Sequence, residues 1–212
     1  MTNTNRPIRR ALVSVFHKEG IEVLAEAFVK AGTEVVSTGS TAKKLAELGV
    51  KVTEVSDVTG FPECLDGRVK TLHPYIHAGI LADMTNPEHA KQLEEFGIKP
   101  FDLVVVNLYP FADTVRSGAN EADTIEKIDI GGISLIRAAA KNFKDVVIVP
   151  SVDQYAEFFE IIDAQHSSTT LEQRRRFAAH AFNVSSHYDT AIFNYFNRQE
   201  KIDSFKLSLT QG

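Results

Sequence analysis

The sequence contains no tryptophan and only one cysteine, Cys64, among its 212 residues. A single cysteine cannot form an internal disulfide, so we expect the protein to function in a reducing cytoplasm. No uninterrupted apolar run approaches the ~18 residues of a membrane helix, and the polar start, 1–7, lacks the apolar core of a signal peptide. These absences predict a soluble, cytoplasmic protein with no membrane partner.

The sequence has fewer basic than acidic residues. Lys and Arg total 23 against 28 Asp and Glu, which gives a formal net charge of −5 and a pI near 5.8. A general nucleic-acid binder carries a basic surface, so we predict no nucleic-acid partner. Hydrophobic residues make up 43% of the chain, enough for a real core, and the length predicts one compact domain with an appendage.

Several ligand-binding signatures are also missing. There is no G-x-x-x-x-G-K-[ST] loop, and no G-x-G-x-x-G follows the first expected strand, so a monophosphate fits better than a triphosphate or a dinucleotide. There is no H-E-x-x-H, and Pro74 disfavours a shared helical face for His73 and His77, so we predict no metal site. Cys64 has no evident partner and is interpreted as structural.

What the chain does contain is a regular alternation of short apolar runs and amphipathic segments. This β-α-β-α-β rhythm with short connections predicts an α/β fold, with a mostly parallel sheet covered by helices. The β-branched run 101–108 is typical of a central strand buried on both faces. The expected strands cover 8–15, 33–36, 50–55, 101–108 and 146–149, and the expected helices cover 21–31, 42–48, 87–96, 133–142, 152–162 and 171–196.

Polar clusters stand where these strands end, which is where open α/β sheets bind ligands. The segment 38–41, Thr-Gly-Ser-Thr, offers hydroxyls and free N–H groups at a helix start and is interpreted as a phosphate cradle. Taken alone, an ordinary N-cap is the commoner explanation of such residues. Ser14 and Lys18 follow the first strand, and Asn107 and Tyr109 follow the central one. Lys18 could neutralise a phosphate at this edge.

The richest concentration of site chemistry lies in 65–80. Arg68 and Lys70 stand two residues apart, Thr71 follows, and an Asp-Gly turn precedes them. We expect Pro74 to prevent the segment from continuing as a regular helix. The stretch is interpreted as a loop that holds an anion, and the alternative is a solvated turn with incidental charges.

Four motifs then carry a resemblance: Gly67-Arg68-Val69-Lys70-Thr71-Leu72-His73-Pro74, Asn107-Leu108-Tyr109-Pro110-Phe111, Asp129-Ile130-Gly131-Gly132 and Arg137-Ala138-Ala139-Ala140-Lys141-Asn142. Together they closely resemble the IMP cyclohydrolase domain of the AICAR transformylase/IMP cyclohydrolase family. They occur in order, and the match runs over nearly the whole chain. The resemblance implies a methylglyoxal-synthase-like three-layer fold with helices on both faces and extra C-terminal helices.

The family's reaction is the closure of FAICAR (5-formamidoimidazole-4-carboxamide ribonucleotide) to IMP with loss of water, without a metal or organic cofactor. By resemblance, Lys70 would stabilise the developing oxyanion, Asp129 paired with Lys141 would relay the proton, and Tyr109 would serve the leaving oxygen. The expected substrate-binding residues are Ser14, Lys18, Thr38, Gly39, Ser40 and Thr41 at the 5′-phosphate, Arg68 and Thr71 at the base end, and Asn107, Gly131 and Asn142.

The chain departs from the family in two ways. The family commonly has Ser-x-Ser-Asp-Lys after the first strand, whereas 14–18 reads Ser-Val-Phe-His-Lys, so one hydroxyl contact is missing. The family also continues into a larger formyl-transfer domain, which is not present in these 212 residues. We therefore expect a cyclohydrolase domain over 1–199, a linker start over 200–212, no transformylase activity and, as an open possibility, a homodimer.

Two rival functions share the fold. Methylglyoxal synthase eliminates phosphate from a triose phosphate, but its characteristic aspartate pattern is not evident here. A non-catalytic effector module, like the regulatory domain of carbamoyl-phosphate synthetase, would need a phosphate cradle but not Lys70, Tyr109, Asp129 and Lys141 together. Conversion of FAICAR to IMP separates both rivals from a cyclohydrolase.

Overall fold

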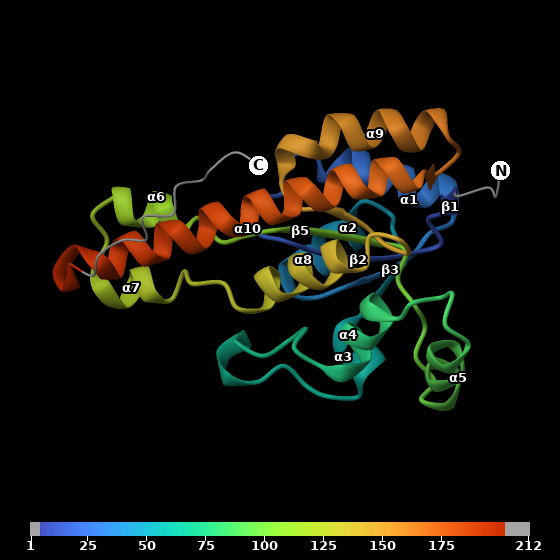
Figure 1. Ribbon diagram of the computed structural model, residues 1–212, viewed down its shortest axis with the longest axis horizontal. Helices are drawn as coiled ribbons and strands as arrows, with labels where there is room; N and C mark the ends of the chain where they lie inside the picture. The colour runs from blue at the N-terminus through green and yellow to red at the C-terminus, as the bar shows by residue number, and fades with distance from the viewer. Residues whose placement is uncertain (1–4, 202–212) are drawn as a thin grey trace.

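A five-stranded parallel sheet forms the centre of the molecule in the computed structural model, which describes residues 5–201 (Figure 1). Its strand order is β4-β3-β2-β5-β6, and every neighbouring pair is parallel. A second sheet of two short antiparallel strands pairs β1 with β7. The strands are β1 (Arg6–Pro7), β2 (Arg10–Val15), β3 (Glu34–Ser37), β4 (Val52–Glu54), β5 (Leu103–Asn107), β6 (Val147–Val149) and β7 (Ser168–Thr169).

Helices connect the strands and cover the sheet. The α-helices are α1 (Ile21–Ala31), α2 (Gly39–Glu47), α3 (Val55–Thr59), α4 (Pro74–Leu81), α5 (Pro87–Glu95), α6 (Phe111–Arg116), α7 (Glu121–Ile125), α8 (Gly131–Lys141), α9 (Tyr155–Ala164) and α10 (Leu171–Glu200). Two short 3₁₀ helices are η1 (Leu65–Gly67) and η2 (Val152–Gln154).

The core is built around β2 and β5, which lie side by side with Ala11 opposite Leu103 and Val15 opposite Asn107. All five residues of β5 are buried, as expected for a parallel strand covered on both faces. From β2 the chain moves outward through β3 and β4, and it later returns to β5 and moves the other way through β6. Because parallel crossovers are right-handed, these two directions place helices on opposite faces of the sheet.

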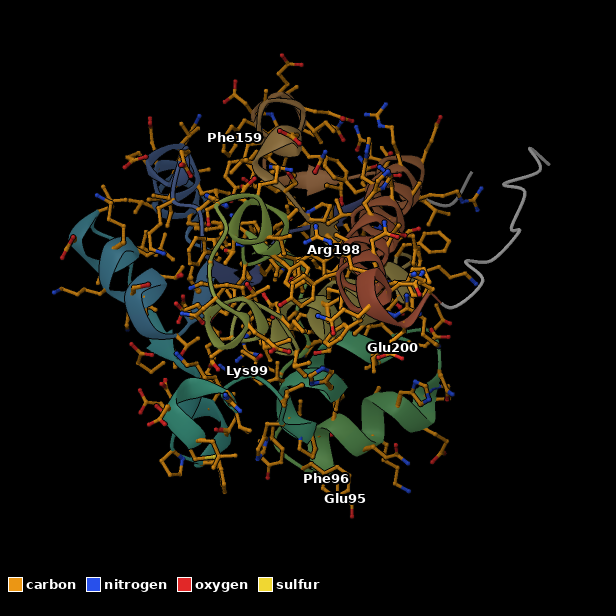
Figure 2. The ribbon with its side chains drawn as sticks, turned by 90° about the vertical axis from the view of Figure 1, so that its left-hand side faces the viewer. Glu95, Phe96, Lys99, Phe159, Arg198 and Glu200 are labelled. Atoms are coloured by element: carbon orange, nitrogen blue, oxygen red, sulfur yellow. The ribbon has the colours of Figure 1, made fainter. Side chains whose placement is uncertain are left out.

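The helices pack as that topology requires. Helices α8 and α10 contact each other and β6, while α1 contacts α2 and α9. Figure 1 shows α10 running across the molecule, with its C-terminal end beside α6 and α7. Both views place α9 and α5 at opposite ends of the molecule, and Figure 2 labels Phe159 on the first and Glu95 and Phe96 on the second.

The predicted α/β fold with a parallel central sheet and extra C-terminal helices is confirmed, and each expected strand and helix is present within a few residues. The expected strand over 50–55 is shorter than predicted, because the chain enters α3 at Val55. Helices α3, α6 and α7 and the β1–β7 sheet were not expected. Each is only two to six residues long, which is too short to show a period in sequence.

The expectation for Pro74 holds for the loop before it, because 68–73 are not helical, but not for the residues after it, because 74–81 are helical. Pro74 begins α4 instead of ending regular structure, because proline at the first helical position gives up an N–H that would have no partner in the helix. His73 is the N-cap and its Nδ1 accepts from the Tyr75 N–H at 3.2 Å. The long helix α10 continues to Glu200, and 202–212, most of the expected linker, lie outside the described residues.

Candidate active site

A cleft of about 720 Å³ opens at the carboxyl ends of the central strands. The chain leaves β2 toward one side of the sheet and β5 toward the other, so the loops after these neighbouring strands diverge and leave a crevice. Thirteen of the fifteen predicted site residues line the cleft: Ser14, Lys18, Thr38, Gly39, Ser40, Thr41, Arg68, Lys70, Thr71, Asn107, Tyr109, Asp129 and Gly131. Its volume suits a ligand of nucleotide size.

Asn107, the last residue of β5, fixes the loop that follows β2. Its Oδ1 accepts from the N–H groups of Phe16 and His17 at 2.7 and 2.8 Å, and its Nδ2 donates to the His17 carbonyl at 2.9 Å. The side chain is 7% exposed. The Asn107 amide therefore shapes one wall of the cleft by holding the backbone of the loop after β2. The sequence alone could not distinguish this structural role from direct contact with a substrate.

The start of α2 is tied to β2 through Thr41. The buried Thr41 hydroxyl donates to the Val15 carbonyl at 2.9 Å and accepts from the Val15 N–H at 3.3 Å. Thr38 is the N-cap, yet its side chain makes no capping hydrogen bond, and Ser40 is exposed on the cleft side. The hydroxyls at 38 and 40 and the first N–H groups of α2 are therefore presented to a ligand, whereas the Thr41 hydroxyl serves the fold.

Lys18 lies over the loop between β2 and α1. Its Nζ donates to the Val15 carbonyl at 2.9 Å and to the Phe16 carbonyl at 3.4 Å. Burial lowers the pKa of the Lys18 ammonium, and the neighbouring Glu19 acts in the opposite direction. Two carbonyl acceptors hold this cation at the cleft wall beside the start of α2.

The loop 65–71 is sharply turned and brings Lys70 into the cleft. Asp66 and Gly67 have positive φ angles of 53° and 86°, a backbone region that Gly adopts readily and Asp tolerates. Lys70 Nζ lies 3.2 Å from a Glu63 carboxylate oxygen. A Cβ built on Gly67 would lie 2.6 Å from Lys70 Cε, and one on Gly39 would lie 3.7 Å from Lys70 Nζ. The missing side chain at 67 thus leaves room for Lys70, whose ammonium lies beside the start of α2.

The same loop also touches the segment before α8. Arg68 and Glu126 form an exposed pair, with Nη2 to Oε2 at 2.5 Å and Nε to Oε1 at 3.3 Å. Thr71 is buried, and its Oγ1 would lie 3.2 Å from a Cβ built on Gly131. The loop therefore spans the cleft from the start of α2 to the start of α8. Glu126 was not among the predicted residues.

Asp129 stands at the entrance to α8. The Gly132 N–H donates to its Oδ1 at 2.6 Å, and a Cβ on Gly132 would lie 2.6 Å from Oδ2, so the glycine permits this close approach. Burial raises the pKa of the Asp129 carboxyl above its ordinary value, while hydrogen bonds from the backbone of Gly132 and Tyr109 act to lower it. Tyr109 and Asp129 are thus neighbours in the fold.

Lys127 was not predicted, yet it lines the cleft. Its Nζ lies 5.7 Å from the ring centroids of both Phe16 and Tyr109, and these rings meet edge to face at 5.3 Å. This cluster joins the loops after β2 and β5 to the segment before α8. Nothing in the sequence spacing links the three residues, so only their proximity in the fold identifies them.

The expected pair of Asp129 with Lys141 is wrong within this chain. Asp129 lies two residues before α8, which is about 16 Å long at 1.5 Å per residue, and Lys141 is the last residue of that helix. Lys141 is exposed and does not line the cleft. Asn142 also lies outside the cleft, and its Nδ2 donates to the carbonyls of Ile80 and Ala82 at 2.8 and 3.0 Å. It joins the end of α8 to the end of α4.

Residues 5–201 contain neither a metal-binding cluster nor a membrane-spanning helix. No group of three or more His, Cys, Asp or Glu side chains within that range is arranged to hold a metal ion. None of the described helices is long and apolar enough to cross a membrane.

The chain matches two family models. The model described as "MGS-like domain" matches residues 20–134, and the model described as "AICARFT/IMPCHase bienzyme" matches residues 139–212. Among solved structures, the chain titled "Crystal structure of ForH" is similar, with 31% identity and a TM-score of 0.75 over 89% of this chain and 98% of that one.

Curated relatives share half of the sequence. The "Bifunctional purine biosynthesis protein PurH" of Cutibacterium acnes is 54% identical over 197 residues, which cover 93% of this chain and 38% of the relative. The protein of the same name from Bradyrhizobium diazoefficiens is 50% identical over 204 residues, covering 96% and 38%. The chain therefore spans 38% of the length of these relatives.

Proposed function

Since this chain belongs to the family of MGS-like domains found in the AICARFT/IMPCHase bienzymes, we propose that it is an IMP cyclohydrolase that closes FAICAR to IMP. The observation that carries the proposal is the composition of one cleft. Hydroxyls and N–H groups at the start of α2, the cations of the loop 65–71, and the Tyr109–Asp129 neighbourhood all face the same 720 Å³ space. A phosphate effector alone would use only the first of these.

The proposed orientation places the 5′-phosphate at the start of α2. The free N–H groups there favour an anion, and Thr38, Ser40, Lys18 and Lys70 lie around that helix end. The base of the nucleotide then points toward Asp129 at the start of α8. Thr71, which lies close to Gly131, borders this end of the cleft.

Ring closure needs a proton to leave the carboxamide nitrogen as that nitrogen attacks the formyl carbon. A new C–N bond forms, and the formyl C=O becomes an oxyanion and then a hydroxyl. We assign proton removal to the Asp129 carboxylate, whose raised pKa makes it a stronger base than an exposed aspartate. Lys70 or the Tyr109 hydroxyl stabilises the oxyanion and protonates the resulting hydroxyl, so that the C–O bond breaks and water leaves. The former formamide nitrogen loses its proton as the C=N bond of the new ring forms. No role in this scheme falls to Lys141.

The relatives' names describe bifunctional proteins. Because this chain spans 38% of their length, we propose that a transformylase domain in the whole protein produces the FAICAR that this cleft consumes. Formyl transfer and dehydration would then be consecutive steps on one nucleotide.

The test is direct. The purified chain is incubated with FAICAR, and IMP is measured by its absorbance and by chromatography. We expect IMP to form, and we expect Asp129→Asn to abolish most of the turnover without loss of the fold. A chain that binds IMP but forms none from FAICAR would refute the proposal in favour of an effector module. Release of phosphate and methylglyoxal from dihydroxyacetone phosphate would refute it in favour of a methylglyoxal synthase.

A further inference from the structure

Tyr188 connects the long helix α10 to the segment that carries Asp129. Its hydroxyl donates to the Lys127 carbonyl at 2.7 Å and accepts from the Asp129 N–H at 2.9 Å. Both partners belong to the short connection between α7 and α8, so one phenol holds the backbone on each side of Ile128. We propose that Tyr188 is a positioning residue for ring closure and acts by holding Asp129 in place. This inference rests on the proposed function of the cleft.

Asp129 is held at two points by these contacts. Tyr188 holds its backbone N–H, and the Gly132 N–H holds its carboxylate at 2.6 Å. The Tyr188 ring packs edge on against Phe111 at 6.3 Å, and Phe111 is 1% exposed, so the phenol has a fixed support. Burial raises the pKa of Tyr188 to about 12, so the hydroxyl keeps its proton and can donate near neutral pH.

Tyr188 and Asp129 lie in parts of the chain that two different family models match. The MGS-like model covers 20–134, which includes Asp129, whereas Tyr188 lies in 139–212, the part that the bienzyme model matches. Figure 1 shows α10 lying along α8 and reaching α6 and α7, which both precede the Asp129 segment in sequence. The C-terminal helix thus supplies a support that the MGS-like part does not contain.

Loss of the Tyr188 contact should affect the rate of ring closure more than the affinity for the substrate. Proton removal requires the carboxylate to lie within hydrogen-bond reach of the attacking nitrogen, and a displacement of about 1 Å can cost on the order of 100-fold in rate. The proposed phosphate cradle at α2 does not touch Tyr188. Loss of the phenol should therefore lower kcat and leave KM for FAICAR nearly unchanged.

Tyr188→Phe is the test, and Tyr195→Phe is its matched control. Tyr195 also lies on α10 and packs on Phe111 at 5.7 Å, but none of the hydrogen bonds described for residues 5–201 involves its hydroxyl. With FAICAR as substrate, we expect Tyr188→Phe to lower kcat at least tenfold with KM within twofold of wild type, and Tyr195→Phe to leave both unchanged. In an Asp129→Asn background, Tyr188→Phe should cause no further loss, because the group through which it acts is already gone.

A second measurement tests the anchor without relying on turnover. Amide hydrogen exchange should be slow at Asp129 in the wild type and fast in Tyr188→Phe, with α8 protected in both. Unchanged kcat in Tyr188→Phe, a loss that multiplies with Asp129→Asn, or fast exchange at Asp129 in the wild type would each overturn the inference. A wild-type chain that forms no IMP refutes the proposed function instead, and that outcome is seen before any variant is compared.

Discussion

At the scale of single residues, Asp129 is the group to which we assign proton removal, and its surroundings change its acidity. An exposed aspartate is a weak base at neutral pH, whereas burial at the entrance to α8 raises the pKa of this carboxyl. The Gly132 N–H at 2.6 Å keeps the carboxylate oriented, and glycine at 132 is what lets the two groups approach. Lys70 presents the complementary charge from the loop 65–71, with Glu63 as its ion-pair partner at 3.2 Å.

The first prediction concerns Asp129→Asn and pH. The wild-type kcat should rise with pH through an apparent pKa above 3.8, and this acidic limb should vanish in the variant together with at least 100-fold of the turnover. The measurement is a pH–rate profile of IMP formation. An unchanged limb in the variant would assign it to another group.

The same substitution has a predicted signature in stability. Because the folded pKa of Asp129 is raised, the native state holds the proton more tightly than the unfolded chain, so wild-type stability falls as pH rises from about 3.9 through the folded pKa. Asparagine can still accept from the Gly132 N–H and does not ionise. Urea denaturation at several pH values should therefore show the stability of Asp129→Asn gaining on wild type over this interval.

The second prediction separates two roles of Lys70, whose ammonium lies beside Gly39 at the proposed phosphate end. If Lys70 stabilises the oxyanion, Lys70→Ala should lower kcat on the order of 100- to 1,000-fold. A rise in KM with kcat unchanged would assign the residue to phosphate binding alone. Lys30→Ala, at an exposed Lys30–Asp163 pair remote from the cleft, is the control and should change neither constant.

At the scale of elements, the cleft depends on how loops and helix ends are tied to the sheet. Asn107 at the end of β5 holds the loop after β2, Thr41 ties α2 to Val15 of β2, and Asn142 joins α8 to α4. These side chains come from predicted motifs, but their polar atoms are occupied by backbone partners. They set the distances between the segments that line the cleft.

The third prediction tests whether the Thr41 hydroxyl holds α2 against β2. Thr41→Val removes a buried hydroxyl that serves both the N–H and the carbonyl of Val15, so it should lower the free energy of unfolding by about 1 to 3 kcal/mol. Thr190→Val, whose exposed hydroxyl donates to the Ser186 carbonyl within α10, should change it by less than about 0.5 kcal/mol. Urea denaturation of both variants checks the difference, and equal stabilities would contradict it.

At the scale of the whole molecule, ligand binding should be coupled to folding through the carboxyl edge of the sheet. The cleft is lined by segments that extend from residue 14 to residue 132, so a ligand there contacts structure that forms only in the folded state. Such a ligand stabilises the protein by mass action.

The fourth prediction uses this coupling. IMP at 100 times its Kd should add about 2.7 kcal/mol to the free energy of unfolding, which raises Tm by about 5 to 11 °C for a chain of this size. Inosine has the same base and ribose without the phosphate and should raise Tm much less at equal concentration. Thermal unfolding followed by circular dichroism is the measurement. Equal shifts would argue against a phosphate cradle at α2.

The sequence by itself determined the fold class and most of the site. The continuous β-branched run of β5 is typical of a buried parallel strand, and amphipathic periods marked α1 and α10. Because parallel strands end at one edge of the sheet, the polar residues that follow β2, β3 and β5 had to meet there. Local chemistry and one topological rule were sufficient for these conclusions.

Only the tertiary structure decided which of those residues line the cleft. Lys141 was expected to pair with Asp129, yet the eleven-residue α8 separates them. Glu126 pairs with Arg68, which lies 58 residues earlier, and Tyr188 contacts Asp129 from 59 residues further along the chain. The physical reason is that a side chain's direction and its partner depend on packing between elements far apart in sequence. Motif spacing gives the separation of residues along the chain, whereas the cleft depends on which residues lie close together in the folded structure.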